Sequence, residues 1–179
     1  DPKNNAIGQV DYNLISAELR AAKRYDEAAE VLKEAIIEFP ENVDFYRQLA
    51  LIPLEQNKYD EAADAYMLYI SKNDKASYND LIQTALLCYY AGVLNTDETQ
   101  KAKATEYVRN SIVYAEKATA VNSENYRPYK VLGDAKVYLA SEADKATAGK
   151  ADYEKALSLI DQEKNASDFA EIQKALGVK

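Results

Sequence analysis

The strongest constraint on the fold is a segment that occurs twice, 34 residues apart. Residues 23–29 read KRYDEAA and residues 57–63 read NKYDEAA. Around each copy, apolar residues recur at helical spacing in two blocks with a short polar break between them. In the first unit these residues are Tyr12, Ile15, Leu19, Ala28, Leu32 and Ala35. Each block gives one apolar face to a helix of about a dozen residues. A helical hairpin cannot bury that face alone, so the pattern predicts an all-α chain of stacked hairpins.

The same residues resemble the tetratricopeptide repeat (TPR) family, whose units are helix pairs of 34 residues. The family pattern has a large residue at position 4, Leu at 7, a small residue at 8, Ala at 20, an aromatic at 24, Ala at 27 and Pro at 32. With Gln9 as position 1, the first repeat supplies Tyr12, Ile15, Ser16, Ala28, Leu32, Ala35 and Pro40. With Val43 as position 1, the second supplies Tyr46, Leu49, Ala50, Ala62, Tyr66, Tyr69 and Asp74.

Two further copies follow if insertions are allowed. Residues 115–118 and 153–156 each resemble the end of a second helix. Counting back seven residues from the last Ala of each segment reaches Ser111 and Gly149, both small, as position 20 requires. Large side chains at these crossings would push the helices apart. We therefore expect close helix crossings at Ser16, Ala28, Ala50, Ala62, Ser111, Gly133 and Gly149.

The resemblance implies one TPR-like superhelical solenoid over residues 1–179, with about four helix pairs and a C-terminal capping helix. We expect the repeats at 9–42, 43–76, 77–125 and 126–161, and the capping helix at 167–177. The third repeat contains an insertion. A helix start at residues 96–98 predicts a second helix in that repeat that runs to Val121, so we expect the helices of this repeat to project beyond the stack.

Composition argues against several classes of function. The net charge of −8 disfavours nucleic-acid binding, which needs a clustered basic face. No run of about 18 apolar residues is present, so we expect no membrane insertion. The chain has no His, which excludes imidazole bases, Ser-His and Cys-His nucleophile pairs and two-His zinc motifs. We therefore predict no catalytic residues, no metal site and no cofactor.

The resemblance also implies where a partner binds. In TPR proteins, positions 2, 5, 9 and 12 of each first helix line the concave face, where an extended peptide or a partner helix is held. Those positions are Val10, Asn13, Ala17 and Arg20; Asp44, Arg47, Leu51 and Leu54; and Arg127, Lys130, Asp134 and Val137. As the partner groove we predict Asn13, Arg20, Arg47, Leu51, Leu54, Arg127, Lys130, Asp134 and Tyr138.

Three cations in this groove have two interpretations. Arg47, Arg127 and Lys130 are positioned to receive a carboxylate of a partner, or they are solvated charges balanced by neighbours such as Asp134. The carboxylate clamp of chaperone-binding TPR domains is not matched, because the positions that need Lys, Asn and Asn hold Asn13, Ala17 and Gln48. We therefore do not expect chaperone-tail binding.

Tyrosine is over-represented, with 15 copies and no Trp. Seven tyrosines occupy positions to which the repeat pattern gives a structural role, wedged between helices: Tyr12, Tyr25, Tyr46, Tyr59, Tyr66, Tyr129 and Tyr153. The pattern does not require Tyr89, Tyr90, Tyr107 or Tyr138, and for these four a core role and a contact role stay equally open.

The leading functional hypothesis is a protein-interaction module that binds a peptide or helix of a partner in its groove. One alternative is a structural element that self-associates through the third-repeat helices or the N-terminal end. A second is a binding protein for a carbohydrate or another small ligand, suggested only by the unassigned tyrosines. The chain begins Asp1-Pro2, which fits a bacterial cell-envelope protein whose leader was removed or, equally, a cytoplasmic fragment.

Overall fold

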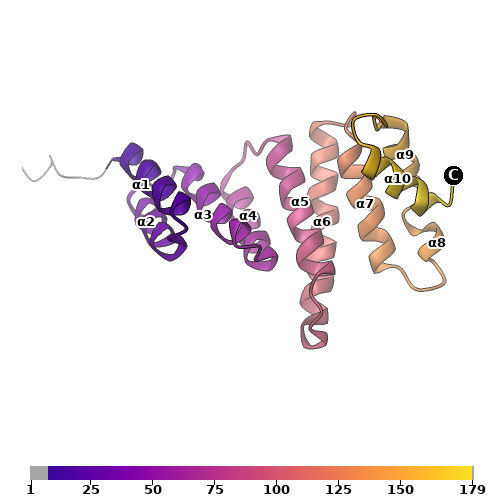
Figure 1. The fold of residues 1–179 in the computed structure, drawn as a ribbon, viewed down its shortest axis with the longest axis horizontal. Helices are drawn as coiled ribbons and strands as arrows, with labels where there is room; N and C mark the ends of the chain where they lie inside the picture. The colour runs from indigo at the N-terminus through magenta and orange to yellow at the C-terminus, as the bar shows by residue number, and fades with distance from the viewer. Residues whose placement is uncertain (1–7, 179) are drawn as a thin grey trace, which may run out of the picture. The chain divides into compact units, whose positions relative to one another are not determined.

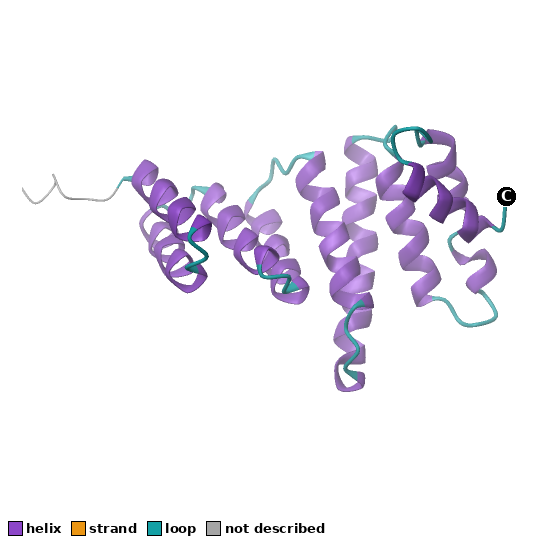
Figure 2. Cartoon of the chain, viewed as in Figure 1, coloured by secondary structure: helices purple, strands orange, loops and turns teal. Residues whose placement is uncertain are grey.

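A computed structural model describes residues 8–178, and within that range the regular secondary structure is helical only (Figure 2). The chain divides into two compact units, Asp1–Asp74 and Lys75–Lys179. The first unit holds α1 (Gln9–Ala21), α2 (Tyr25–Glu38), α3 (Val43–Glu55) and α4 (Tyr59–Lys72). The second unit holds α5 (Tyr78–Val93), a short 3-10 turn (Glu98–Gln100), α6 (Lys101–Val121), α7 (Tyr126–Leu139), α8 (Lys145–Ala148), α9 (Lys150–Leu159) and α10 (Ala166–Leu176).

The predicted fold class is confirmed. Successive helices pair as α1 with α2, α3 with α4, α5 with α6, and α7 with α8 and α9, and α10 packs on α9. All seven small residues predicted at the helix crossings are buried. The expectation of a single domain over residues 1–179 stays a prediction, because each unit is defined by its own internal contacts.

Helix boundaries follow local capping chemistry. The Ser77 hydroxyl accepts from the Asp80 backbone N–H at 3.2 Å, and the Asp80 carboxylate accepts from the Ser77 backbone N–H at 3.0 Å, which forms a capping box at the start of α5. At the C-terminal end, Gly177 takes a left-handed φ of +67° and ends α10.

The third repeat has the long helices that the insertion predicts. The 21 residues of α6 begin directly after the turn at Glu98–Gln100 and run to Val121. In Figure 1 the connected ends of α5 and α6 extend past the end of α7. At the close α5–α6 contact, a Cβ on Gly92 would lie 2.6 Å from the carbonyl oxygen of Ala104. Gly92 was not among the predicted crossing residues.

The fourth repeat differs from a simple helix pair. Its second helix is divided at Gly149 into α8 and α9. Gly is a poor helix former because it loses the most backbone entropy on ordering. Its missing side chain also lets the backbone of this helix approach Gly133 on α7 more closely than any Cβ would allow.

Candidate functional site

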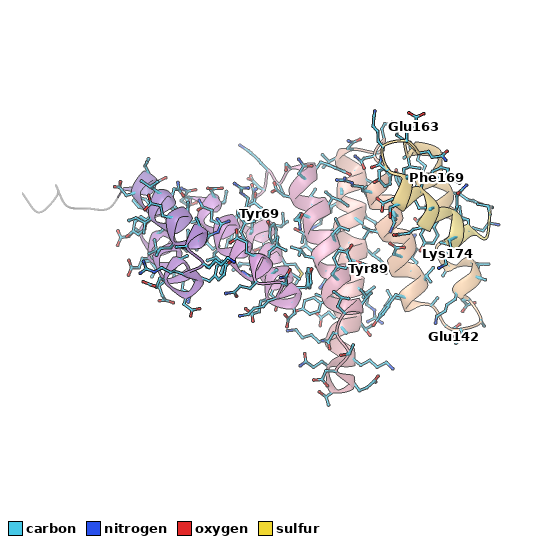
Figure 3. The ribbon with its side chains drawn as sticks, viewed as in Figure 1. Tyr69, Tyr89, Glu142, Glu163, Phe169 and Lys174 are labelled. Atoms are coloured by element: carbon cyan, nitrogen blue, oxygen red, sulfur yellow. The ribbon has the colours of Figure 1, made fainter. Side chains whose placement is uncertain are left out.

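A cleft of about 380 Å³ opens between α5, α7 and α10 in the second unit. Its walls combine aliphatic, aromatic and charged side chains. They are Leu86, Tyr89 and Tyr90 from α5, Arg127, Lys130, Val131 and Asp134 from α7, and Asp168 and Glu171 from α10. Figure 3 labels Tyr89 on α5 within this unit. The volume lies in the range of clefts that bind small ligands.

Helix α7 presents its polar residues to the cleft because its other face is committed to the core. Leu132 and Ala135 are buried on that face. Asn125 caps the helix by accepting from the Arg127 backbone N–H at 3.0 Å, which fixes where the first turn begins. Arg127, Lys130 and Asp134 then follow at spacings of three and four residues, so they lie on one side of the helix.

Lys130 sits at the centre of a network that joins α7, α9 and α10. Its Nζ lies 3.1 Å from Asp134 Oδ2 and 3.0 Å from Glu171 Oε2. The Tyr153 hydroxyl donates to Asp134 Oδ1 at 2.7 Å. Burial alone would lower the pKa of Lys130, but Asp134 and Glu171 together raise it above its ordinary value. Lys130 therefore stays protonated, and its positive charge is already balanced by ion pairs with two carboxylates.

Arg127 differs from Lys130 because no carboxylate lies within ion-pair distance of its guanidinium among residues 8–178. A hydrogen bond with the Tyr126 hydroxyl raises the pKa of Arg127, and burial partly opposes this effect. The same hydroxyl donates to Asp168 Oδ2 at 2.6 Å. Arg127 is thus held at the edge of the cleft with its charge uncompensated by a direct ion pair.

Burial raises the pKa values of two tyrosines on α5. Burial, reinforced by Asp134, raises the pKa of Tyr89 to about 12. Burial likewise raises the pKa of Tyr78 to about 12, and its buried hydroxyl has no hydrogen-bond partner among the described residues. Both phenols are therefore neutral at physiological pH and offer rings and hydroxyls rather than charge.

Helix α10 closes one side of the cleft and is anchored by an apolar residue. Ile172 is fully buried in a cluster with Tyr126, Tyr153 and Ala156. Asp168 and Glu171 lie on the same helix and face α7 through the bonds to Tyr126 and Lys130. The sequence pattern predicts this segment only as a capping helix and does not indicate the role of either carboxylate. The signal that could have indicated it is their spacing, which places them beside Ile172 on the packed side of α10.

Of the predicted groove residues in this unit, Arg127, Lys130 and Asp134 line the cleft together. Tyr138 is exposed and is not among the lining residues. Among the four unassigned tyrosines, Tyr107 is a core residue, Tyr90 is exposed and Tyr89 is half-buried in the cleft wall.

In the first unit, the predicted groove residues Asn13 and Arg20 of α1 bond to side chains of α3. Arg20 on α1 forms a two-pronged ion pair with Glu55 on α3. Gln48 Nε2 donates to Asn13 Oδ1 and, at 2.8 Å, to Asp44 Oδ2. The pairs Arg20–Glu55 and Asn13–Gln48 are each separated by 35 residues, which is one repeat plus one position.

The remaining groove residues of the first unit lie on α3. Arg47 pairs with Asp44 at 2.9 Å. Leu51 and Leu54 are half-buried. The assignment of all nine residues to one partner groove stays a prediction, since five lie in the first unit and four in the second.

Residues 8–178 contain neither a metal-binding group of side chains nor a helix that could span a membrane. No group of three or more His, Cys, Asp or Glu side chains is placed to hold a metal ion there. None of the described helices combines the length and the apolar character needed to cross a bilayer.

Comparison with known proteins identifies the repeat. Residues 19–84 match the model of the tetratricopeptide repeat family. None of the curated proteins matches the chain in sequence. Similar solved structures include TTC0263, a thermophilic TPR protein of Thermus thermophilus, with 17% identity and a TM-score of 0.57 over 95% of this chain and 84% of that one.

Two other solved structures share the fold. MamA residues 41 to the end, from Desulfovibrio magneticus RS-1, is 15% identical with a TM-score of 0.62 over 95% of this chain and 97% of that one. YrrB, described as a TPR protein with an unusual peptide-binding site, is 10% identical with a TM-score of 0.56 over 97% of this chain and 87% of that one. At these identities the likeness concerns the fold.

Proposed function

We propose, from the premise that this chain belongs to the tetratricopeptide repeat family, that it is a protein-interaction module which binds a peptide segment of a partner in the cleft between α5, α7 and α10. Members of this family are generally scaffolds without catalytic activity, and we assign no reaction to this chain. The peptide-binding site reported for YrrB is a property of that protein, and it supports peptide binding as a use of this fold.

The observation that carries the proposal is the contrast between the two cations of the cleft. Lys130 is neutralised by Asp134 and Glu171, whereas Arg127 has no carboxylate at ion-pair distance among the described residues. Arg binds carboxylates through two parallel hydrogen bonds, because the geometry of its planar fork matches the two oxygens of a carboxylate. Arg127 is therefore the group in the cleft best suited to bind a carboxylate of a partner.

The other side chains that line the cleft indicate which kind of residue lies beside the carboxylate in the bound peptide. Leu86, Tyr89 and Val131 supply an apolar and aromatic surface beside Arg127. Tyrosine and Arg are the residue types that most often dominate the binding energy of interfaces. A peptide with Asp, Glu or its own C-terminal carboxylate next to an apolar side chain satisfies both parts of the cleft.

Selection from a phage-displayed library of random 12-residue peptides against the full chain tests this function. We expect enriched peptides to carry a carboxylate beside an apolar residue. Fluorescence polarisation should then show that Arg127→Glu weakens their binding at least tenfold. Arg109→Glu is the matched control, because Arg109 is an exposed cation on α6, a helix that does not line the cleft.

Two outcomes would overturn the proposal. One is that no peptide is enriched above background. The other is that enriched peptides bind Arg127→Glu as tightly as they bind the Arg109→Glu control.

A further inference from the structure

The most exposed tyrosines of the second unit lie on neighbouring helices. Of the tyrosines within residues 8–178, only Tyr90 and Tyr138 are exposed, at 42% and 41%, and the others are buried or half-buried. Tyr90 belongs to α5 and Tyr138 to α7. A single exposed aromatic ring needs no explanation, but exposed rings that gather at one place indicate a binding site.

Helical spacing and the packing of α5 on α7 bring these two rings to the same place. On α7, Tyr138 follows Lys130 and Asp134 at intervals of four residues, so it continues the row that lines the cleft. On α5, Tyr90 follows Leu86 at the same interval. The two helices are in contact, and in Figure 1 they run in the same direction. The two rows therefore approach each other with Tyr90 and Tyr138 at the same end.

Tyr89 supplies a third ring at this end, and we call Tyr89, Tyr90 and Tyr138 the tyrosine cluster. The ring centroids of Tyr89 and Tyr90 are 5.8 Å apart, and their planes are inclined at 60°. Burial and then Asp134 raise the pKa of Tyr89, and Tyr90 and Tyr138 raise it further, so both lie within electrostatic range of Tyr89. Rings inclined in this way form two walls that meet at an angle rather than one flat surface.

The charges near the tyrosine cluster favour a cation as the ligand. Two cations and three carboxylates line the adjoining cleft, which leaves it with a net charge of −1. The cation that acts on Tyr89 is Lys130, and its charge is balanced by ion pairs with Asp134 and Glu171. The face of an aromatic ring is electrostatically negative and attracts a cation that lies within about 6 Å of its centroid.

The hydrogen-bond acceptors beside the cluster favour a cation without N–H groups. Both oxygens of Asp134 are engaged, since Oδ1 accepts from the Tyr153 hydroxyl at 2.7 Å and Oδ2 accepts from Lys130 at 3.1 Å. A primary ammonium group leaves water only where acceptors replace its lost hydrogen bonds. A trimethylammonium group has no N–H to satisfy, and its charge is presented through methyl groups that ring faces attract.

We propose that the tyrosine cluster binds the trimethylammonium group of a small molecule of the choline type. The methyl groups contact the three rings, and the exposed Leu94, one turn beyond Tyr90, extends the apolar rim. The adjoining cleft, of about 380 Å³, has room for a ligand of this size. Arg127 lies about 16 Å along α7 from Tyr138, so this site does not rest on the carboxylate contact of the proposed function.

Isothermal titration calorimetry of the full chain with choline chloride tests the proposal. The matched ligand is dimethylbutanol, the isostere of choline in which a carbon atom replaces the nitrogen and removes the charge. We expect choline to bind at least tenfold more tightly than this alcohol, because the ring faces attract only the cation. Ethanolamine has the same charge as choline but carries N–H groups, and it should also bind at least tenfold more weakly than choline.

Variants test the rings themselves. Tyr90→Leu and Tyr138→Leu keep an apolar side chain but remove a ring face, so we expect each to weaken choline binding at least threefold and the double variant at least tenfold. Tyr90→Phe and Tyr138→Phe are the matched controls, because each keeps the ring and loses only the hydroxyl. They should bind choline within about twofold of the parent protein. Circular dichroism should show unchanged helix content in all of them, since both side chains are exposed.

Three results would overturn the proposal. The first is choline that does not bind, or that binds no more tightly than dimethylbutanol. The second is a pair of Leu variants that bind choline as tightly as the Phe variants do. The third is a trimethyllysine amide that binds at least tenfold more tightly than choline, because it would assign the tyrosine cluster to a modified side chain of a partner protein instead.

Discussion

Gly149 and Gly133 are in direct backbone contact where the second helix of repeat four crosses α7. A Cβ added to Gly149 would lie 2.6 Å from the carbonyl oxygen of Gly133 and 2.9 Å from its Cα. Real Cβ atoms essentially never come this close to another backbone, so the crossing is available only to glycine. On the other side, a Cβ on Gly133 would lie 2.6 Å from the ring of Tyr153.

Gly149→Ala should therefore destabilise the second unit although Ala is the better helix former. The methyl group meets backbone atoms that cannot rotate away, so we expect a loss of about 1–3 kcal/mol in the free energy of unfolding. Urea denaturation, monitored by circular dichroism, measures this loss. Gly8→Ala is the control, because the nearest atom to its added Cβ is Asp11 Oδ2 at 3.5 Å. A Gly149→Ala protein as stable as the control would contradict the close crossing.

The crossings were predictable because they depend on position within the repeat. Ser111 and Gly149 were located by counting back from an Ala, and both are buried. The bonds Arg20–Glu55 and Asn13–Gln48 could also have been predicted, since residues one repeat plus one position apart lie side by side on neighbouring first helices.

The cleft was less predictable because it depends on elements outside the repeat. Asp168 and Glu171 reach α7 only through the path that the chain takes after α9, and no repeat position encodes that path. The division into α8 and α9 escaped prediction for a related reason. Gly149 was identified as a small crossing residue, but its effect on helix continuity depends on how closely α7 approaches.

The turn between the helices of each repeat gives a second prediction. Lys23 and Asn57 occupy the same repeat position, and both have left-handed backbones, with φ of 58° and 59°. Asn tolerates this conformation, whereas for most other L-residues it costs about 1–2 kcal/mol. Lys23→Gly should raise the free energy of unfolding by about 0.5–1 kcal/mol after the greater entropy of Gly in the unfolded chain is counted. Thermal denaturation measures the gain.

Asn57→Gly is the comparison for that variant. Because Asn already accepts the left-handed conformation, this change should stay within about 0.5 kcal/mol of the parent protein. Equal effects at the two positions would show that strain at Lys23 is not the cause.

The anchoring of α10 gives a third prediction. Ile172 is fully buried, and its truncation to Ala removes apolar contacts with Tyr126, Tyr153 and Ala156. We expect Ile172→Ala to cost about 2–5 kcal/mol, the range for large-to-small changes in cores. Val178→Ala is the control, because Val178 is exposed beyond the end of α10. Hydrogen exchange should show faster exchange throughout α10 in Ile172→Ala, and unchanged exchange there would contradict its role as the anchor.

The phenol of Tyr89 makes stability depend on pH in the alkaline range. Burial raises its pKa to about 12 in the folded protein, against about 10 in an unfolded chain. Between these values the folded state keeps a proton that the unfolded state releases, so the free energy of unfolding falls as the pH rises from 10 to 12. Because Tyr89 is partly open to solvent, its contribution to this decline should stay below about 1 kcal/mol per pH unit.

Tyr89→Phe should flatten this decline, and below pH 9 the difference in free energy of unfolding between the variant and the parent protein should be constant. Urea denaturation at intervals from pH 7 to pH 12 measures both curves, and parallel curves throughout would show that this phenol ionises no less readily in the folded protein than in the unfolded chain.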